Sequence, residues 1–340
     1  MEKIRVLIVD DSAVVREILS TRLGADPRIQ VVATAPDPYV ARTKLETMDV
    51  DVVTLDLEMP RMDGLTFLRH LMRDHPLPVV VVSSLASDHS VALSCLDAGA
   101  IALVAKPGGP LSVGTMVEDL IDKIIGGARA HRVAPAPSVS VEPPNLLART
   151  TTTRHLVAVG ASTGGTQALE VLFRSFPEDF PPVLAVIHMP EGFTSSFARR
   201  LDSLVPMTVK EAEDRERVLP GTIYIARGNS HLVVRALGTD RVLHLSPAPR
   251  VFNQRPSVDV LFQSAAESLG KNVTGVLLTG MGKDGAAGLK TILDAGGTTA
   301  AQDEATSVVF GMPKEAIALG AAQAVLPLER IGPWVRETLP

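Results

Sequence analysis

Three polar residues, Ser162, His188 and Asp284, each follow a short apolar run that ends abruptly. Ser162 stands in the stretch VGASTGG, where Gly160 and Gly164 frame it in the pattern GxSxG. That pattern exposes a serine hydroxyl on a tight turn between a strand and a helix. A serine becomes a nucleophile when a histidine takes its proton and a carboxylate orients that histidine. The three residues therefore predict acyl transfer by a serine hydrolase.

Each of these residues also has a structural interpretation. Ser162 could cap the helix that follows it, and Asp284 could do the same before GAAGLKTIL. His231, in a loop before another apolar run, competes with His188 for the role of base. The order serine, histidine, aspartate differs from that of α/β-hydrolases, so GxSxG does not indicate a lipase-type enzyme here.

Two glycine-rich segments imitate phosphate-binding motifs. GASTGG has the outline of a dinucleotide fingerprint, but Ser162 replaces its second glycine. GMGKDG resembles a P-loop, but Asp284 occupies the position of the required hydroxyl residue. Neither segment predicts a nucleotide site.

A second set of polar residues follows successive apolar runs early in the chain. It contains three carboxylates, a hydroxyl and an ammonium group: Asp10, Asp11, Asp56, Ser83 and Lys106. Converging carboxylates repel one another unless a cation joins them, and oxygen ligands favour Mg²⁺. The hydroxyl and the lysine would hold the oxygens of a phosphoryl group, so Asp56 is a candidate for covalent phosphorylation. Taken singly, each residue could merely cap a helix, and VVTLD also fits a Walker B strand.

Alternating apolar runs and helical patterns must position both sets of residues. In the first half, the runs cover residues 4–9, 29–33, 50–55, 78–83 and 100–104. This alternation predicts an α/β fold with a five-stranded parallel sheet, whose ligand site lies at the carboxyl ends of the strands. The second half repeats the alternation, and short runs on either side of Gly238 add a small antiparallel hairpin. We expect a second, doubly wound α/β domain with a mainly parallel sheet.

The length of 340 residues favours two domains. Between them the periodicity disappears, and four prolines fall among Ala, Val and Ser at positions 135, 137, 143 and 144. This composition is typical of a linker. The predicted boundaries are therefore 1–125 for the first domain, 126–153 for the linker and 154–340 for the second domain.

Composition excludes several classes of protein. The net charge of -5 argues against sequence-independent nucleic-acid binding. Apolar runs are too short to span a membrane, and the first residues lack the pattern of a signal peptide, so we expect a cytoplasmic protein without membrane insertion. The single cysteine, Cys95, lies in an apolar helical pattern, which predicts a buried structural thiol.

Residues 1 to about 125 resemble a response-regulator receiver domain, which has a flavodoxin-like fold. The resemblance implies that Asp56 accepts the phosphoryl group and that Mg²⁺ supports its transfer. It also assigns the remaining residues: Asp10, Asp11, Asp56 and the backbone carbonyl of Glu58 bind Mg²⁺, and Ser83 and Lys106 contact the phosphoryl group. Receivers commonly carry an aromatic switch residue where this chain has Leu103, so the resemblance does not extend to the mode of signal transmission.

Residues 155 to 330 resemble the catalytic domain of chemotaxis protein-glutamate methylesterases. The matching segments are VGASTGGTQAL, IHMPEGFTSSFARRL, RPSVDVLFQSAA, GVLLTGMGKDGAAGL and AQDEATSVVFGMPKEA. The resemblance implies that Ser162 is the nucleophile, that His188 is the general base and acid, and that Asp284 orients the histidine. It further implies that backbone near Met281 stabilises the oxyanion with Thr163 beside the nucleophile, and that this half needs no cofactor.

The family's activity is hydrolysis of γ-methyl glutamyl esters on chemoreceptors, usually with deamidation of receptor glutamines. The resemblance therefore implies chemoreceptors as substrates and a chemotaxis histidine kinase as phosphodonor. We expect the unphosphorylated receiver to inhibit the esterase and phosphorylation of Asp56 to relieve that inhibition. Two alternatives remain: the same chemistry in another sensory pathway, or a phospho-dependent receptor-binding module with vestigial catalysis. A transcriptional regulator would instead need a basic recognition helix after the linker.

Overall fold

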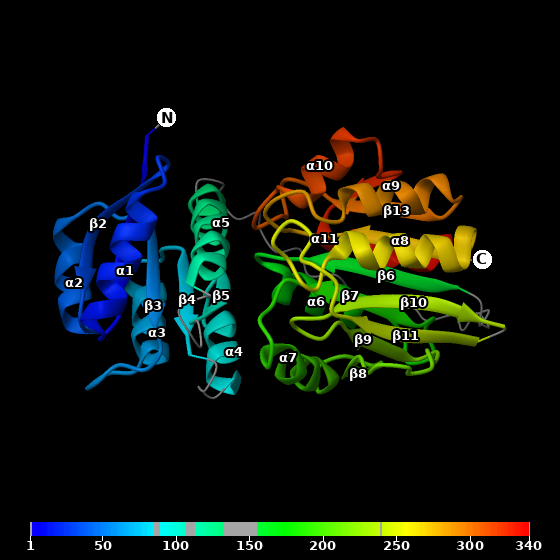
Figure 1. Ribbon diagram of the computed structural model, residues 1–340, viewed down its shortest axis with the longest axis horizontal. Coiled ribbons are helices and arrows are strands. Elements are labelled where there is room, and N and C mark those ends of the chain that lie inside the picture. The colour runs from blue at the N-terminus through cyan, green and yellow to red at the C-terminus, as the bar shows by residue number, and fades with distance from the viewer. Residues whose placement is uncertain (1, 85–88, 107–112, 132–154, 239, 340) are drawn as a thin grey trace. The chain divides into compact units, whose positions relative to one another are not determined.

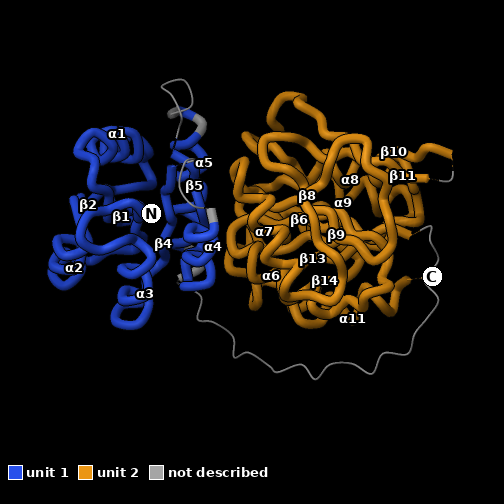
Figure 2. The backbone as a smooth tube through the Cα atoms, turned by 90° about the horizontal axis from the view of Figure 1, so that it is seen from below, with its two compact units in different colours: residues 1–134 blue, residues 135–340 orange. Residues whose placement is uncertain are grey.

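The computed structural model describes residues 2–84, 89–106, 113–131, 155–238 and 240–339. The chain divides into two compact units, residues 1–134 and 135–340 (Figure 2). Both are α/β units, and we describe each one separately. No helix in these described ranges is long and apolar enough to cross a membrane.

The first unit is built on a parallel sheet with the strand order β2-β1-β3-β4-β5. Its strands are β1 (Ile4–Val9), β2 (Ile29–Ala35), β3 (Val52–Asp56), β4 (Val79–Ser83) and β5 (Ala102–Ala105). Its helices are α1 (Ala13–Gly24), α2 (Pro38–Thr47), α3 (Gly64–Asp74), α4 (His89–Asp97) and α5 (Val113–His131). Helices α1 and α5 pack on one face of the sheet, with α2, α3 and α4 on the other (Figure 2). The predicted five-stranded parallel sheet is confirmed.

Local sequence explains how these helices begin. The Ser12 side chain accepts a hydrogen bond from Val15 N and caps α1. Asp37 caps α2 in the same way, accepting from Tyr39 N and Val40 N. Because each cap lies within three residues of the end of a strand, the loops at this part of the carboxyl edge of the sheet are short.

Helix α5 continues past residue 125, where the sequence predicts the domain to end. Ala128 is buried in this last part of the helix and joins the apolar core of the unit. Gly127 permits the close packing, because a Cβ there would collide with Ile101 beside β5. The rest of the predicted linker, residues 132–153, lies outside the described residues.

The second unit contains a seven-stranded parallel sheet with the order β14-β13-β12-β6-β7-β9-β8. Figure 1 labels five of its strands, β13, β6, β7, β9 and β8. Its strands are β6 (Leu156–Ala161), β7 (Val183–Ile187), β8 (Thr208–Glu211), β9 (Thr222–Ile225), β12 (Val273–Leu277), β13 (Thr298–Gln302) and β14 (Ala324–Leu326). A separate antiparallel hairpin joins β10 (His231–Leu237) to β11 (Asp240–Ser246). Both the parallel sheet and the small hairpin agree with the prediction.

Helices cover both faces of this sheet. They are α6 (Gly165–Arg174), α7 (Phe193–Asp202), α8 (Val258–Leu269), α9 (Ala286–Asp294), α10 (Met312–Ala318) and α11 (Leu328–Thr338), with a short 3₁₀ turn at Gly270–Asn272. Helix α8 packs against β6, β12, the hairpin strand β10 and helix α9, whereas α11 packs against α6 and β13. The sequence analysis missed β8, which has alternating burial at the sheet edge, and α11, whose pattern is interrupted by Pro333.

Three central strands, β12, β6 and β7, are neighbours in this sheet, and every residue in them is buried. Side chains of β6, β7 and β12 contribute to one apolar core together with α8 and α9. Burial on both faces is typical of parallel strands and accounts for the uninterrupted apolar runs in the sequence. The three strands thus form a rigid support for whatever follows their carboxyl ends.

Candidate active site

The carboxyl edge of the second sheet collects the three predicted catalytic residues. Ser162 directly follows β6, His188 directly follows β7, and Asp284 lies in the loop between β12 and α9. The His188 N–H donates to the Ala161 carbonyl oxygen at 3.2 Å, which ties the end of β7 to the residue before Ser162. Since β6 lies between β7 and β12, the serine comes between the strands that carry its two predicted partners.

Ser162 lies in a turn that its own backbone stabilises. Its N–H donates to the Thr279 carbonyl oxygen at 2.9 Å, and its carbonyl oxygen accepts from Gly165 N at 2.7 Å. Helix α6 is capped at Gly164, whose φ of 76° lies in the left-handed region, and no side chain caps it. The alternative that Ser162 caps this helix is therefore wrong. No hydrogen bond within the described residues engages its hydroxyl, so Ser162 and His188 are not hydrogen-bonded to each other in this structure.

The imidazole of His188 is bonded to Asp284. Its Nε2 lies 2.8 Å from Asp284 Oδ2, and the exposed fractions of the two side chains are only 3% and 2%. Burial by itself raises the pKa of the Asp284 carboxyl. The hydrogen bond from His188, the charge of His188 and the backbone N–H donors lower that pKa by more, so it lies below its usual value. Because an ionised carboxylate only accepts hydrogen bonds, Nε2 carries a proton, and in the neutral imidazole Nδ1 then has the lone pair. Nδ1 is therefore the nitrogen that can accept a proton.

Asp284 does not cap the helix that follows it. The N-cap of α9 is Gly285, with a φ of 89° and no side-chain cap, so that alternative is also wrong. The Asp284 carboxylate instead accepts hydrogen bonds at the start of α8, from Val258 N at 2.8 Å and Asp259 N at 3.0 Å. The N-terminal end of a helix favours a negative charge, so α8 helps to keep Asp284 ionised.

Two backbone N–H groups beside Ser162 have no acceptor in the described structure. They belong to Met281, near which the backbone is expected to stabilise an oxyanion, and to Thr163, which is expected only to lie beside the nucleophile. Gly280 brings Met281 close, because a Cβ at Gly280 would lie 2.7 Å from Ser162 Cβ. The Thr163 Oγ1 is likewise buried without a partner among the described residues. Free N–H donors next to a serine hydroxyl are the arrangement that an oxyanion intermediate requires.

His231 is not available as a base. Its side chain is buried, with Nε2 3.0 Å from the Pro249 carbonyl oxygen and Nδ1 accepting from Ser257 N at 3.1 Å. Both ring nitrogens are therefore occupied by backbone groups. Of the two histidines that the sequence left in competition, His188 alone is bonded to Asp284 and next to the serine turn.

The polar residues of the first unit converge at the carboxyl edge of its sheet. Carboxylate oxygens of Asp10, Asp11 and Asp56 lie within 4.8 Å of one another. Lys106 Nζ lies 2.9 Å from Asp10 Oδ2 and 2.8 Å from Asp56 Oδ2. Ser83, the last residue of β4, is buried at the same edge, and Glu58 N lies 3.4 Å from Asp56 Oδ1.

The electrostatics of this cluster follow from its burial. Burial raises the pKa of Asp56, and the hydrogen bond and charge of Lys106 offset only part of this increase. Burial lowers the pKa of Lys106, but the hydrogen bonds and charges of Asp56 and Asp10 outweigh it, so its pKa lies above the usual value. A single ammonium group faces three carboxylates, so the cluster retains negative charge. Converging carboxylate oxygens with unbalanced charge fit a hard divalent cation such as Mg²⁺.

Cys95, the single cysteine, is buried in α4. Burial raises the pKa of its thiol to about 12. A thiol with this pKa stays protonated at neutral pH and is a poor nucleophile. The prediction of a buried structural thiol is confirmed.

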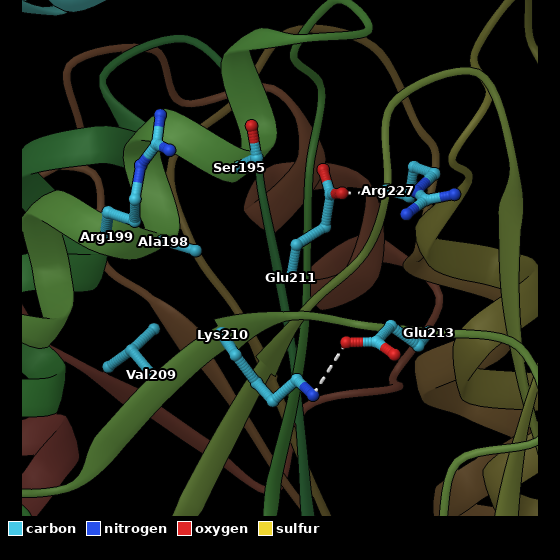
Figure 3. Close-up of a pocket in the computed structure, with 8 residues that line it drawn as sticks. All are labelled: Ser195, Ala198, Arg199, Val209, Lys210, Glu211, Glu213 and Arg227. Atoms are coloured by element: carbon cyan, nitrogen blue, oxygen red, sulfur yellow. Dashed lines mark hydrogen bonds and ion pairs between the residues drawn. The ribbon is translucent and has the colours of Figure 1, made fainter.

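A pocket of about 250 Å³ lies beside α7, apart from the three catalytic candidates (Figure 3). It is lined by Ser195, Ala198, Arg199, Val209, Lys210, Glu211, Glu213 and Arg227. Figure 3 shows Lys210 paired with Glu213 and Arg227 paired with Glu211 across the hollow; their N–O distances are 2.9 Å and 3.1 Å. These charges are satisfied by each other, so we assign no chemistry to the pocket.

Sequence reasoning missed two residues that support the site. Ser257 caps α8 and donates its hydroxyl to Asp284 Oδ1 at 2.7 Å. Gly280 allows the backbone before Met281 to approach Ser162. A serine just before an apolar-periodic helix predicts an N-cap, but nothing in that signal predicts a second bond to a distant carboxylate.

Comparisons with known proteins identify the family of each unit. Residues 157–335 match the family model of the CheB methylesterase, and residues 6–118 match that of the response regulator receiver domain. A protein-glutamate methylesterase/protein-glutamine glutaminase from Anaeromyxobacter dehalogenans is 50% identical over 98% of this chain and 94% of its own length. A relative with the same name from Bordetella parapertussis is 51% identical over 97% of this chain and 96% of its own length.

A solved structure resembles the second unit. The CheB methylesterase catalytic domain of Thermotoga maritima is 43% identical, with a TM-score of 0.54, and the match covers 55% of this chain and 99% of that domain. That share corresponds to one of the two units, not to the full chain. The relative's catalytic domain is therefore a structural counterpart of the second unit alone.

Proposed function

This chain belongs to the CheB methylesterase family, and on that premise we propose that it hydrolyses γ-methyl glutamyl esters of chemoreceptors, releasing methanol, and deamidates receptor glutamines. The observation that carries the proposal is the bond of 2.8 Å between His188 Nε2 and Asp284 Oδ2, next to a serine with a free hydroxyl. Two relatives of nearly equal length carry both activities in their names. The role of the enzyme would be sensory adaptation in chemotaxis.

The reaction begins with proton transfer from the Ser162 hydroxyl to His188 Nδ1. The serine oxygen attacks the side-chain carbonyl carbon of the substrate, and the N–H groups of Thr163 and Met281 stabilise the oxyanion that forms. Collapse of this intermediate breaks the bond to the methoxy group, which takes the proton from His188 and leaves as methanol. Asp284 stays ionised and stabilises the imidazolium throughout.

Water then hydrolyses the glutamyl ester formed on Ser162. His188 takes a proton from the water, whose oxygen attacks the same carbonyl carbon. The second oxyanion collapses, the serine oxygen leaves and recovers its proton from His188, and a free glutamate side chain remains. Deamidation follows the same path, with ammonia leaving in place of methanol. These side chains perform both half-reactions without a cofactor in this unit.

The receiver unit would supply the control. We assign Asp56 as the phosphoacceptor, with Asp10, Asp11, Asp56 and the Glu58 carbonyl as Mg²⁺ ligands. When bound, Mg²⁺ neutralises charge on the phosphoryl group as it is transferred. Lys106 and Ser83 lie at the same edge and would bind phosphoryl oxygens through an ammonium and a hydroxyl group. The phosphodonor would be a chemotaxis histidine kinase, which places the reaction in the cytoplasm.

The proposal predicts that phosphorylation stimulates ester hydrolysis. Methanol release from a methylated receptor cytoplasmic fragment is measured with the full chain, in the presence and absence of acetyl phosphate and Mg²⁺. We expect methanol in both conditions and a higher rate with acetyl phosphate. If no fragment in a panel of receptor fragments released methanol, the assigned substrate would be rejected. Equal rates with and without acetyl phosphate would reject control by phosphorylation.

A further inference from the structure

We propose that Ser257 is a positioning residue for the Asp284 carboxylate, and that His231 holds Ser257 in place for this role. The inference deepens the proposed function, on which it rests, because it names residues that act on the acid of the catalytic set without touching substrate. Ser257 is fully buried, and its Oγ donates to Asp284 Oδ1 at 2.7 Å. It stands at the N-cap of α8, between the catalytic loop and the hairpin strand β10.

Four hydrogen-bond donors contact the Asp284 carboxylate, two at each oxygen. Oδ2 accepts from His188 Nε2 and from Val258 N, both at 2.8 Å. Oδ1 accepts from Ser257 Oγ at 2.7 Å and from Asp259 N at 3.0 Å. Among these donors, Ser257 Oγ is the one side-chain group besides the histidine itself. Without it, Oδ1 would keep a single backbone donor, and the carboxylate could rotate away from the direction that fixes His188.

The hydroxyl of Ser257 has a defined direction. Its oxygen accepts from Val260 N at 3.5 Å, which is the capping bond of α8, and its hydrogen is directed at Asp284. One hydroxyl thus satisfies the helix terminus and the carboxylate together. Threonine has the same hydroxyl and can keep both bonds, whereas alanine loses both.

His231 fixes the backbone at Ser257. Ser257 N donates to His231 Nδ1 at 3.1 Å, so Nδ1 must carry a lone pair. Nε2, with the proton, lies 3.0 Å from the Pro249 carbonyl oxygen. The buried imidazole is therefore held as one neutral tautomer, linking the 247–256 segment to the start of α8. Its contacts explain why a histidine that is no base is placed so near the catalytic set.

The test compares three variants of the full chain: Ser257→Ala, Ser257→Thr and the matched control Ser264→Ala. Ser264 is also buried in α8, but its hydroxyl bonds Leu261 O and Val234 N and does not touch Asp284. We expect Ser257→Ala to lower kcat for methanol release about 10- to 100-fold with little change in KM, as for loss of a hydrogen bond to a charged group. Ser257→Thr should restore most of kcat, and Ser264→Ala should change it less than about twofold.

A second readout does not depend on activity. The proton on His188 Nε2 that is shared with Asp284 should give a downfield NMR resonance, assigned by its loss in His188→Gln. We expect Ser257→Ala and His231→Ala to broaden or shift this resonance, and Ser264→Ala to leave it unchanged. The inference would be overturned if Ser257→Ala left both the resonance and kcat unchanged. It would also be overturned if Ser264→Ala lowered kcat as much as Ser257→Ala does. If wild type released no methanol but the resonance responded as described, the proposed function would fail and the positioning role would stand.

Discussion

Gly280 lies against Ser162 so closely that a Cβ added to the glycine would come within 2.7 Å of Ser162 Cβ and 3.2 Å of Ser162 N. The same Cβ would also collide with Met312 Sδ. The loop after β12 and the serine turn after β6 are thus packed backbone to backbone. This contact fixes the backbone of Ser162, the proposed nucleophile, relative to the loop that carries Met281.

Gly280→Ala should therefore impair catalysis more than it impairs folding. The methionine side chain can move, but the serine backbone cannot move without displacing the nucleophile. We expect kcat to fall by about 10- to 100-fold, since a misplacement near 1 Å can have that effect. The free energy of unfolding should fall by about 1–3 kcal/mol. The control is Gly24→Ala, at a helical position where a Cβ meets nothing within 4 Å. This variant should retain the wild-type kcat. A wild-type kcat in Gly280→Ala would contradict the packing argument.

Asp259 should make the second unit less stable as the pH rises. Burial raises the pKa of its carboxyl to about 6, and the charge of Asp284 adds to this effect. The folded state then binds this proton more tightly than the unfolded chain, whose aspartate pKa is about 3.9. The stabilisation by this bound proton is fully present below the unfolded-state pKa of about 3.9, and it is lost as the pH rises through the folded-state pKa of about 6.

Asp259→Asn removes this titration and keeps an oxygen that can accept the bond from Gly288 N. We expect the variant to gain about 1–3 kcal/mol over wild type near pH 7.5, and less near pH 5. Urea unfolding followed by the fluorescence of Trp334, the single tryptophan, measures the second unit. If the difference in free energy of unfolding between Asp259→Asn and wild type were the same at both pH values, the pKa of Asp259 would not be raised by its surroundings.

Phosphorylation should require both Asp56 and a divalent cation. Asp56→Asn replaces the nucleophilic carboxylate with an amide, and chelation of Mg²⁺ leaves three carboxylates that repel the incoming phosphoryl group. We expect no acetyl phosphate-dependent mass increase in either case, and no stimulation of methanol release. The basal rate of Asp56→Asn should stay near that of unphosphorylated wild type. Stimulation that persists in Asp56→Asn would place the acceptor elsewhere.

Residues 150–340 alone should hydrolyse ester faster than the unphosphorylated full chain. The prediction follows from inhibition by the receiver, and the isolated domain from Thermotoga maritima, a counterpart of this unit, indicates that such a fragment can be studied. Methanol release is compared at equal protein concentration, with the phosphorylated full chain as reference. Equal activity of the fragment and the unphosphorylated chain would rule out inhibition within the chain.

The sequence predicts much of this architecture because parallel strands buried on both faces appear as uninterrupted apolar runs. The apolar runs that precede Ser162 and His188 correspond to β6 and β7, and the convergence of these residues follows from the rule for the carboxyl ends of parallel strands. The edge strand β8 was missed because its burial is mixed, so its pattern is weak.

The contacts of the site were less predictable from the sequence. The sequence left His188 and His231 in competition, because each stands at one end of a predicted strand and only tertiary contacts distinguish them. The bond from Ser257 to Asp284 joins residues 27 positions apart through the packing of α8 against α9. Such bonds depend on how two helices meet, which local patterns do not encode.

The central claim is that the Ser162 oxygen is the nucleophile for ester hydrolysis. Its most direct test is methanol release from a methylated receptor fragment by wild type, Ser162→Ala and the control Ser203→Ala, whose exposed hydroxyl bonds Arg200 O away from the site. We predict that Ser162→Ala folds as wild type does but releases no methanol above background, even with acetyl phosphate, and that Ser203→Ala keeps the wild-type rate. Methanol release by folded Ser162→Ala at a rate near that of wild type would contradict the account.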